Sequence, residues 1–346
     1  MKRLISMVVL AAGIALGSNA MAAEWNFYGS ARVQTFWADV DDGTDSEVNY
    51  SESLQGNSRI GAKVKVSDEL VGRFEYGADG AGGTANIRHL YGEWDFGTGK
   101  LLVGQTTSLL HFGLSNQVYG DDESLEHYGN LDASRRPMIR LTFGDFQIAA
   151  ISPKIDDLGA VETQVIMPKL EAKYELSMDS FTIMAAAGYQ TYEVTTVGGE
   201  DLDVDTYILA IGGKVNLGPA YIGAGGWFGQ NVGPYGVDIK ADADPFLNVV
   251  AGELEDNDAY GLMGVVGFKA NDTLALEAGI GYVSAELDTN GSHEDDAMAY
   301  YLQATITLAK GVTIVPEIGM LDYLDKADGT DQGDEFYYGM KWQINF

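Results

Sequence analysis

Residues 336–346 read Phe-Tyr-Tyr-Gly-Met-Lys-Trp-Gln-Ile-Asn-Phe, and their pattern indicates how the chain folds. Apolar side chains stand at every second position from Phe336 to Phe346, and the positions between them are mostly polar or glycine. A period of two is the period of a β-strand, whose successive side chains point to opposite faces of a sheet. The stretch therefore predicts a strand with one apolar face and one mostly polar face.

The same alternation recurs through the chain, in residues 59–66, 274–282 and 298–309. We expect strands over residues 25–38, 56–66, 70–78, 85–96, 99–107, 136–143, 146–153, 163–176, 180–195, 203–217, 219–232, 258–270, 273–287, 297–309, 311–324 and 334–346. Most of them are on the order of ten residues long, as a tilted membrane strand requires, whereas soluble strands average about five to six.

The connections between these strands alternate between short and long. Short turns fall at 67–69, 97–99, 144–145, 218–219, 271–272 and 310–311, and long acidic segments at 39–55, 108–134, 154–162, 233–257, 288–296 and 325–333. Short turns at one end and long loops at the other are typical of bacterial membrane barrels. The sequence thus predicts an all-β fold, a transmembrane antiparallel β-barrel of about sixteen strands with a lumen wide enough for water.

The N-terminus carries an export signal. Lys2 and Arg3 precede an apolar run from Ile5 to Leu16, and Ala20-Met21-Ala22 fits a cleavage site. The apolar run is too short for a membrane-spanning helix. We therefore expect residues 1–22 to be a cleaved signal peptide and residues 23–346 to form the barrel domain.

Composition excludes several functions. The chain has 21 basic and 51 acidic residues, and residues 1–22 hold two of the basic ones and none of the acidic ones, so residues 23–346 carry a formal charge of −32. A polyanion of this kind does not bind nucleic acid through phosphate contacts. Cysteine is absent, which excludes disulfides, thiolate zinc sites and a cysteine nucleophile.

Several segments together resemble the general bacterial porins. The resembling segments are Phe27-Tyr28-Gly29-Ser30-Ala31, Arg59-Ile60-Gly61, Arg88 with Tyr91 and Trp94-Asp95-Phe96-Gly97, the run from Lys100 to Gln105, and the final Phe346. The resemblance covers the mature chain in architecture. It implies an outer-membrane, homotrimeric, sixteen-stranded channel, and it implies that Phe346 is the residue recognised by the barrel-assembly machinery.

In that family the third loop folds into the lumen, and its acidic residues face arginines on the barrel wall. Here the loop runs from Ser108 to Ser134 and would supply Asp121, Asp122, Glu123, Glu126 and Asp132. The wall would supply Arg32, Arg59, Arg73, Arg88, Arg135 and Arg136. Opposed charges across a narrow gap order water and filter solutes by size and dipole. The family's Pro-Glu-Phe-Gly motif at the loop tip is missing, and Tyr119-Gly120-Asp121-Asp122-Glu123 stands in its place.

The expected function is passive diffusion of ions and small hydrophilic solutes across the outer membrane of a Gram-negative bacterium, without a cofactor. Expected partners are membrane lipid, lipopolysaccharide and the permeating solutes. A substrate-specific channel is the alternative, followed by a barrel enzyme or adhesin. Ser108, Ser115 and Ser124 lie near His111 and His127 in sequence, but no Gly-x-Ser-x-Gly motif supports a hydrolase.

Net charge and constriction charge act in opposite directions on ion preference. The net charge of residues 23–346 favours cations, while arginines at a constriction favour anions, and we expect a mild cation preference. Acidic loop segments such as Asp242-Ala243-Asp244 could bridge calcium or magnesium to lipopolysaccharide, since both ions prefer carboxylate oxygens. They lack EF-hand spacing, so we expect them to be solvated and predict no metal site.

Overall fold

The computed structural model describes residues 23–41, 46–78, 83–248, 251–289 and 292–346, so the expected signal peptide, residues 1–22, lies outside the described residues. The strands before the third loop are β1 (Glu24–Asp41), β2 (Ser46–Leu54), β3 (Arg59–Lys65), β4 (Leu70–Gly77), β5 (Asn86–Asp95) and β6 (Lys100–Thr107). Those after it are β7 (Arg135–Phe143), β8 (Phe146–Ile151), β9 (Glu162–Gln164), β10 (Lys169–Ser177), β11 (Phe181–Thr195), β12 (Asp201–Leu217), β13 (Ala220–Gln230), β14 (Phe246–Asn248), β15 (Glu253–Glu255), β16 (Asn257–Lys269), β17 (Leu274–Leu287), β18 (Asp295–Ala309), β19 (Val312–Asp322) and β20 (Asp334–Asn345).

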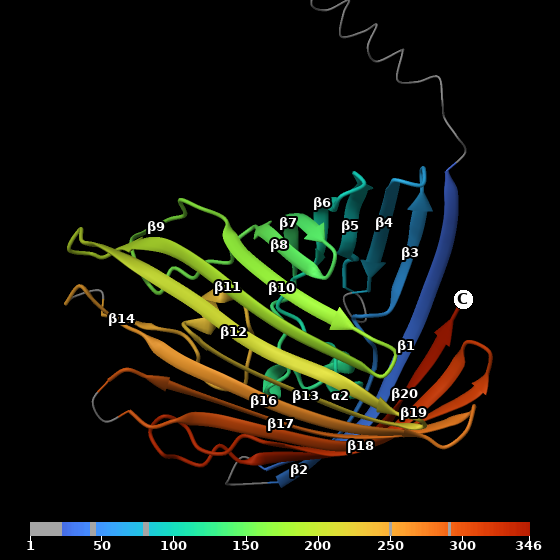
Figure 1. Ribbon diagram of the computed structural model, residues 1–346. Coiled ribbons are helices and arrows are strands. Elements are labelled where there is room, and N and C mark those ends of the chain that lie inside the picture. Colours follow the sequence, from blue (N-terminus) through green and yellow to red (C-terminus); the bar gives the residue numbers. More distant parts are fainter. Residues whose placement is uncertain (1–22, 42–45, 79–82, 249–250, 290–291) are drawn as a thin grey trace, which may run out of the picture.

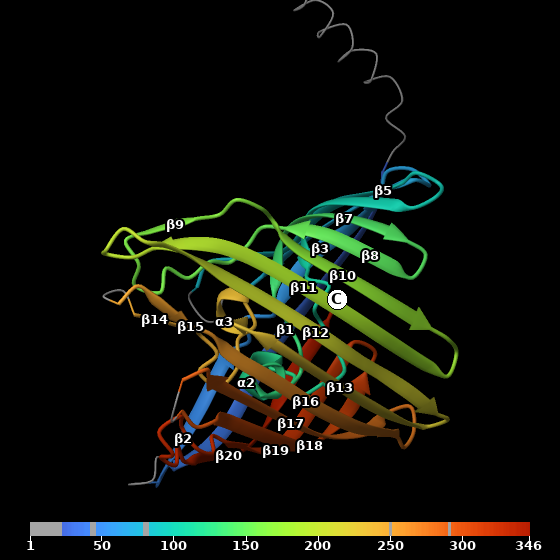
Figure 2. The same ribbon diagram turned by 60° about the vertical axis from the view of Figure 1, so that its left-hand side comes forward.

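All strands except β14 and β15 belong to one antiparallel sheet that closes on itself, because β1 pairs with β20 as well as with β2 and β3. The sheet has 18 described strands. Two of its barrel strands are interrupted, since β2 and β3 both pair with β1 and β9 and β10 both pair with β11. The result is the expected closed barrel of sixteen strands. Figure 1 and Figure 2 show its curved wall in two views 60° apart.

The alternation read from the sequence corresponds to the two faces of the barrel wall. On β20, Tyr338, Trp342 and Ile344 are exposed on the outside, whereas Tyr337 and Lys341 are buried on the inside. Aromatic clusters mark both ends of the outer face. Trp37 stacks with Tyr338 at the long-loop end, and Phe96 packs against Trp94 and Phe143 beside the short turns. Such girdles belong at the two interfaces of a membrane.

The strand expected at 163–176 is interrupted between β9 and β10. Two of the expected loops also differ from the expectation. Part of the loop expected at 39–55 is the strand β2, which continues the β1 pairing outward from Val33↔Leu54 to Asp41↔Ser46. The loop expected at 233–257 contains the hairpin of β14 and β15 and the short helix α3 (Val232–Tyr235). The acidic residues of both segments suggested irregular loops. Backbone pairing in the first segment, and backbone pairing with apolar burial in the second, produce regular structure instead.

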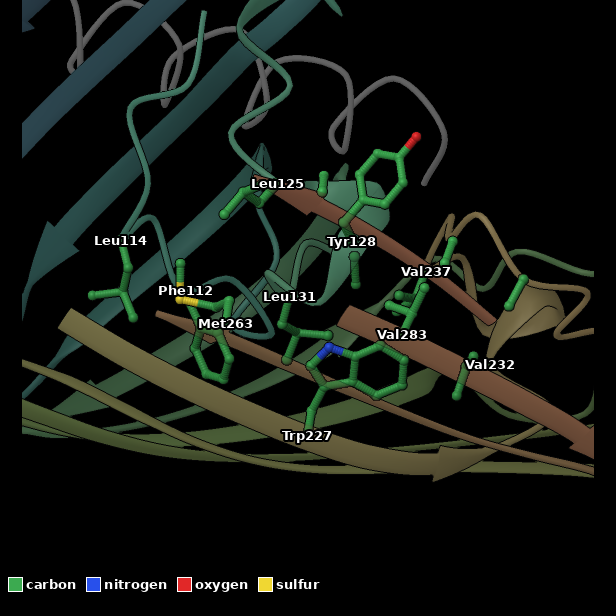
Figure 3. Close-up of a cluster of buried hydrophobic side chains, with 14 of the residues drawn as sticks. Phe112, Leu114, Leu125, Tyr128, Leu131, Trp227, Val232, Val237, Met263 and Val283 are labelled. Atoms are coloured by element: carbon green, nitrogen blue, oxygen red, sulfur yellow. The ribbon is translucent and has the colours of Figure 1, made fainter. Parts of the chain in front are cut away.

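The third loop, Ser108–Ser134, contains the helix α2 (Tyr119–Asp122) and the 3-10 helix η1 (Glu126–Tyr128). Its apolar residues pack on the inner face of the wall: Figure 3 shows Tyr128 and Leu131 beside Trp227 of β13, Met263 of β16 and Val283 of β17. Glycines permit this approach. A Cβ on Gly281 of β17 would lie 1.8 Å from the Tyr128 carbonyl oxygen.

Among the described residues, the helices are all too short or too polar to cross a membrane.

Candidate pore constriction

Three of the six wall arginines converge on one carboxylate that the sequence did not single out. Glu75 of β4 is completely buried. Arg73 Nη2 and Arg88 Nε each donate to it over 2.8 Å, and the Tyr28 hydroxyl donates to it over 2.8 Å. Arg59 Nη1 lies 3.7 Å away. The cluster holds three guanidinium groups against one carboxylate, so it leaves an excess of positive charge on the wall.

A β-bulge between β4 and β5 explains how Arg88 reaches this cluster. The register passes from Glu75↔His89 to Tyr76↔Ile87, which leaves Arg88 as the additional residue. An extra residue re-aims its side chain and shifts the parity of the strand. Both Arg88 and its neighbour His89 therefore lie near Glu75, at 2.8 and 3.9 Å.

The tip of the third loop is bound to the wall at β1 and β20. Asp122 accepts from Lys341 Nζ over 2.7 Å and from Asn57 Nδ2 over 2.7 Å, and it forms an ion pair with Arg32. Asp121 accepts from the backbone N–H of Gly56 over 2.9 Å. Arg32 and Asp122 therefore meet directly rather than facing each other across a gap.

The tip has an unusual backbone. Asp121, Asp122, Ser124 and Leu125 all have positive φ angles, between 58° and 68°. Non-glycine residues in this region store backbone strain and persist only where surrounding contacts hold them. Gln117 holds this turn, because its Oε1 accepts from Leu125 N over 2.8 Å and its Nε2 donates to Tyr337 over 3.0 Å.

Three glutamates on the wall accept backbone N–H groups of the third loop. Glu171 of β10 binds Leu109 N at 2.8 Å, Glu277 of β17 binds Asn116 N at 2.8 Å, and Glu317 of β19 binds Val118 N at 2.7 Å. Glu317 also accepts from Tyr119 N at 3.0 Å. Charge-assisted hydrogen bonds to backbone groups are strong and fix the path of the loop against β10 and β17–β19.

The remaining acidic residues of the third loop form pairs within the loop. Glu123 Oε1 lies 2.9 Å from His127 Nδ1. Asp132 lies 3.6 Å from His111 Nδ1, and Glu126 is close to both. Side-chain hydrogen bonding to Glu123, together with Asp238, raises the pKa of His127 despite its burial.

Arg135 and Arg136 have different surroundings. Arg135 lies within electrostatic reach of Arg88, Glu126 and Asp132. Arg136 donates to the carbonyl oxygen of Pro153 over 3.2 Å. The structure thus brings Arg59, Arg73 and Arg88 together, brings Arg32 to Asp122, and leaves Arg136 apart from both groups.

A second loop, between β13 and β16, packs on the third loop. Val232, Tyr235 and Val237 are buried in the same cluster as the third loop (Figure 3). Lys240 N donates to the His127 carbonyl over 3.0 Å, and the Tyr235 hydroxyl donates to Glu171 over 3.0 Å. In the sequence, the apolar side chains within residues 232–237 indicated this packing, because a solvated acidic loop does not need apolar side chains.

Sequence reasoning missed Glu75, Lys341 and the three glutamates that hold the loop. Each stands on the inner face of a strand that the alternation predicted correctly. A search for charged residues at the alternate positions that face the inside of the barrel would therefore have found them. The third-loop partners of Lys341 and of the three glutamates lie 62 to 219 positions away, and the hydrogen-bond partners of Glu75 lie 2 to 47 positions away. No pattern within a single strand indicates which charges meet.

Comparison with known proteins agrees with this architecture. The sequence model of Gram-negative porins matches residues 6–326. No curated protein sequence matches significantly. The outer-membrane channel DcaP of Acinetobacter baumannii is 17% identical, with 95% of this chain and 99% of that chain covered and a TM-score of 0.73.

Two further solved structures share the fold. The anion-selective porin from Comamonas acidovorans is 15% identical, covers 94% of this chain and 100% of that chain, and has a TM-score of 0.61. The trimer form of OmpT of Vibrio cholerae is 19% identical, covers 94% of this chain and 100% of that chain, and has a TM-score of 0.58. The chain therefore belongs to the Gram-negative porin family, and it is an outer-membrane channel for passive diffusion of small solutes.

Proposed function

We propose that this porin is a size-limited, general diffusion channel, and that its narrowest part lies between the third loop and the wall strands β3–β5. The observation that carries the proposal is the asymmetric packing of the third loop. Its backbone is bound to β10, β17 and β19, and its apolar side chains are packed on β13–β17. The arginines around Glu75 belong to β3, β4 and β5, and none of the described residues of these three strands belongs to this buried cluster.

Charge at this constriction favours anions. Arg59, Arg73 and Arg88 share one carboxylate, and Arg32 and Lys341 share Asp122. The acidic external loops act over longer distances and are screened over about 8–10 Å in physiological salt. We therefore propose a weak anion preference, opposite to the preference that the net charge favours.

Single-channel conductance of the refolded protein across a salt gradient tests the proposal. Arg59→Gln is the most informative variant, because Arg59 is the cluster arginine farthest from Glu75, at 3.7 Å, and its removal leaves two arginines and Tyr28 on that carboxylate. We expect the reversal potential of this variant to shift toward cation preference.

Arg140→Gln is the matched control. This variant removes the same charge as Arg59→Gln, but from β7. There Arg140 Nη2 lies 3.4 Å from Glu93, near the short turn at 97–99. We expect it to leave the reversal potential close to that of the unmodified channel. Equal shifts in both variants, or none in Arg59→Gln, would mean that the arginine cluster does not line the narrowest part. Saturable conductance that a solute competes for would favour a substrate-specific channel.

We also propose a homotrimer, a form that the OmpT structure records for that protein. Conductance steps in groups of three would support it. The exposed apolar outer face fits contact with membrane lipid and lipopolysaccharide, and residues 1–22 fit a signal peptide removed on export. We propose in addition that the barrel-assembly machinery recognises the chain through Phe346.

The serines and histidines of the third loop support a channel rather than an enzyme. Ser108 Oγ donates to Glu171 over 2.7 Å, Ser115 Oγ lies 2.8 Å from the Tyr301 hydroxyl, and Ser124 Oγ donates to the Asp122 carbonyl over 3.1 Å. Each hydroxyl is thus engaged with a group other than histidine, while a serine nucleophile needs a histidine within hydrogen-bond reach. We expect no hydrolysis of phospholipid or peptide reporters.

A further inference from the structure

Three potential metal ligands meet at the base of the third loop. His111 and Asp132 stand opposite each other where the two legs of the loop form an isolated β-bridge. Glu126 of η1 completes the group, and one donor atom from each residue lies within 4.8 Å of the other two. These residues take no part in the ion pairs that bind the loop tip to Arg32 and Lys341.

The imidazole in this group lacks a hydrogen-bond partner. His111 Nδ1 is shielded from solvent and makes no hydrogen bond within the described residues. Its distance of 3.6 Å to Asp132 Oδ2 is too long for one. A buried nitrogen of this kind normally has a partner, so its orientation toward the two carboxyl groups indicates a site for a ligand between them.

The two carboxyl groups of this cluster also lie close together. A carboxylate oxygen of Glu126 and one of Asp132 are within 4.8 Å of each other, and two ionised carboxylates at this separation repel. A cation between the two carboxyl groups would remove this repulsion.

We propose that His111, Glu126 and Asp132 bind one zinc ion, with water in the remaining position. One imidazole nitrogen and two carboxylate oxygens suit zinc, whereas calcium and magnesium prefer oxygen ligands alone. Ligand atoms of a tetrahedral zinc ion with bonds of about 2.0–2.2 Å lie roughly 3.4 Å apart. The donor atoms here lie within 4.8 Å of one another, so the cluster needs to contract by up to about 1.4 Å. The side chain of His111 is 33% exposed, which leaves an approach for the ion.

Zinc would also change the charge of the channel. Two positive charges on the third loop, within reach of Arg135, would strengthen anion preference. This consequence rests on the proposed constriction, whereas binding of zinc does not, so the two are measured separately.

Calorimetric titration of zinc chloride into the refolded, chelator-treated protein tests the site. We expect one tight site per chain, with weaker binding at the acidic external loops. His111→Ala should weaken the tight site by at least the roughly 10–100-fold that loss of a supporting outer residue costs at a metal site. Glu126→Gln should do the same and serves as the second variant if His111→Ala does not fold.

His293→Ala is the matched control, because His293 is exposed in an outer loop, and it should bind zinc as the unmodified protein does. Cobalt gives an independent readout, since its visible absorption should appear in the unmodified protein and be lost in His111→Ala. Equal zinc affinity in His111→Ala and the unmodified protein, or no tight site in either, would overturn the proposal. Reversal potentials with and without zinc then test the consequence: tight binding without any shift would support the site and contradict its place at the constriction.

Discussion

Glu75 is the residue on which the charge distribution of the wall depends. A buried carboxylate needs compensating charge and hydrogen bonds, and here Arg73, Arg88 and Tyr28 supply them at 2.8 Å each. Glu75→Gln removes the only negative charge of the cluster. We expect a loss of stability on the order of 3 kcal/mol, measured by urea unfolding of the refolded barrel, and a shift of the reversal potential toward anion preference.

Glu93→Gln is the appropriate comparison for Glu75→Gln. Glu93 stands on the neighbouring strand β5, is partly exposed, and pairs more loosely with Arg140 at 3.4 Å and Lys100 at 3.7 Å. Surface ion pairs of this kind contribute about 0–1 kcal/mol. If the two variants lost equal stability, the arginine cluster would hold Glu75 no more firmly than an ordinary surface pair.

The same cluster shows where residue-level prediction from the sequence ends. The arginines at 59, 73 and 88 could be chosen in advance, because arginine facing lipid near the middle of a membrane costs roughly 2–4 kcal/mol. In residues 85–96, which side chains face the lumen could not be read from the alternation, because the bulge at Arg88 arises from pairing with β4. The register between two strands depends on both strands, so the sequence of one strand alone does not determine it.

Among the elements, the third loop depends most on glycines of the wall. The closest approach is at Gly281 of β17, where an added Cβ would lie 1.8 Å from a backbone oxygen of Tyr128 that cannot rotate away. We expect Gly281→Ala to cost about 1–3 kcal/mol through overpacking and to push the loop toward the arginine cluster. The conductance of single channels should therefore fall.

Gly264→Ala on the adjacent strand β16 is the matched control. A Cβ there would meet its nearest atom, the Gly223 carbonyl oxygen, at 4.0 Å, which is ordinary contact. We expect stability and conductance to remain as in the unmodified channel. A Gly281→Ala channel with unchanged conductance and stability would show that the loop does not press on β17.

The elements were predictable to very different degrees. The barrel strands lie within a few residues of the expected ranges, because alternation and turn residues are local signals. The packing of the β13–β16 connection on the third loop was not predictable, because it depends on contacts such as that of Lys240 with His127, 113 positions earlier. The apolar residues Val232, Tyr235 and Val237 were the available signal, and their acidic neighbours obscured it.

For the whole molecule, closure of the barrel depends on the pairing of β20 with β1. The register runs from Ser30↔Asn345 to Asp41↔Asp334, and Phe346 extends it through backbone hydrogen bonds with Gly29 at 2.7 and 3.0 Å. Among the described residues, closure leaves the barrel sheet without a free edge, which protects a channel without disulfides from pairing with other chains. The backbone of Phe346 thus belongs to the closing seam, whereas its side chain is 72% exposed.

This separation of backbone and side chain allows the assembly role of Phe346 to be tested. Phe346→Ala keeps the backbone pairing and removes only an exposed ring, so the refolded barrel should keep its conductance and lose no more than about 0.5 kcal/mol of stability. In cells, the amount of heat-modifiable barrel in the outer membrane should fall several-fold, because the assembly machinery would no longer recognise the chain. Ile344→Ala removes another outward side chain, 54% exposed, from the same strand and should assemble nearly normally. If Phe346→Ala refolds in vitro as poorly as it assembles in cells, the ring stabilises the barrel itself and is not an assembly signal.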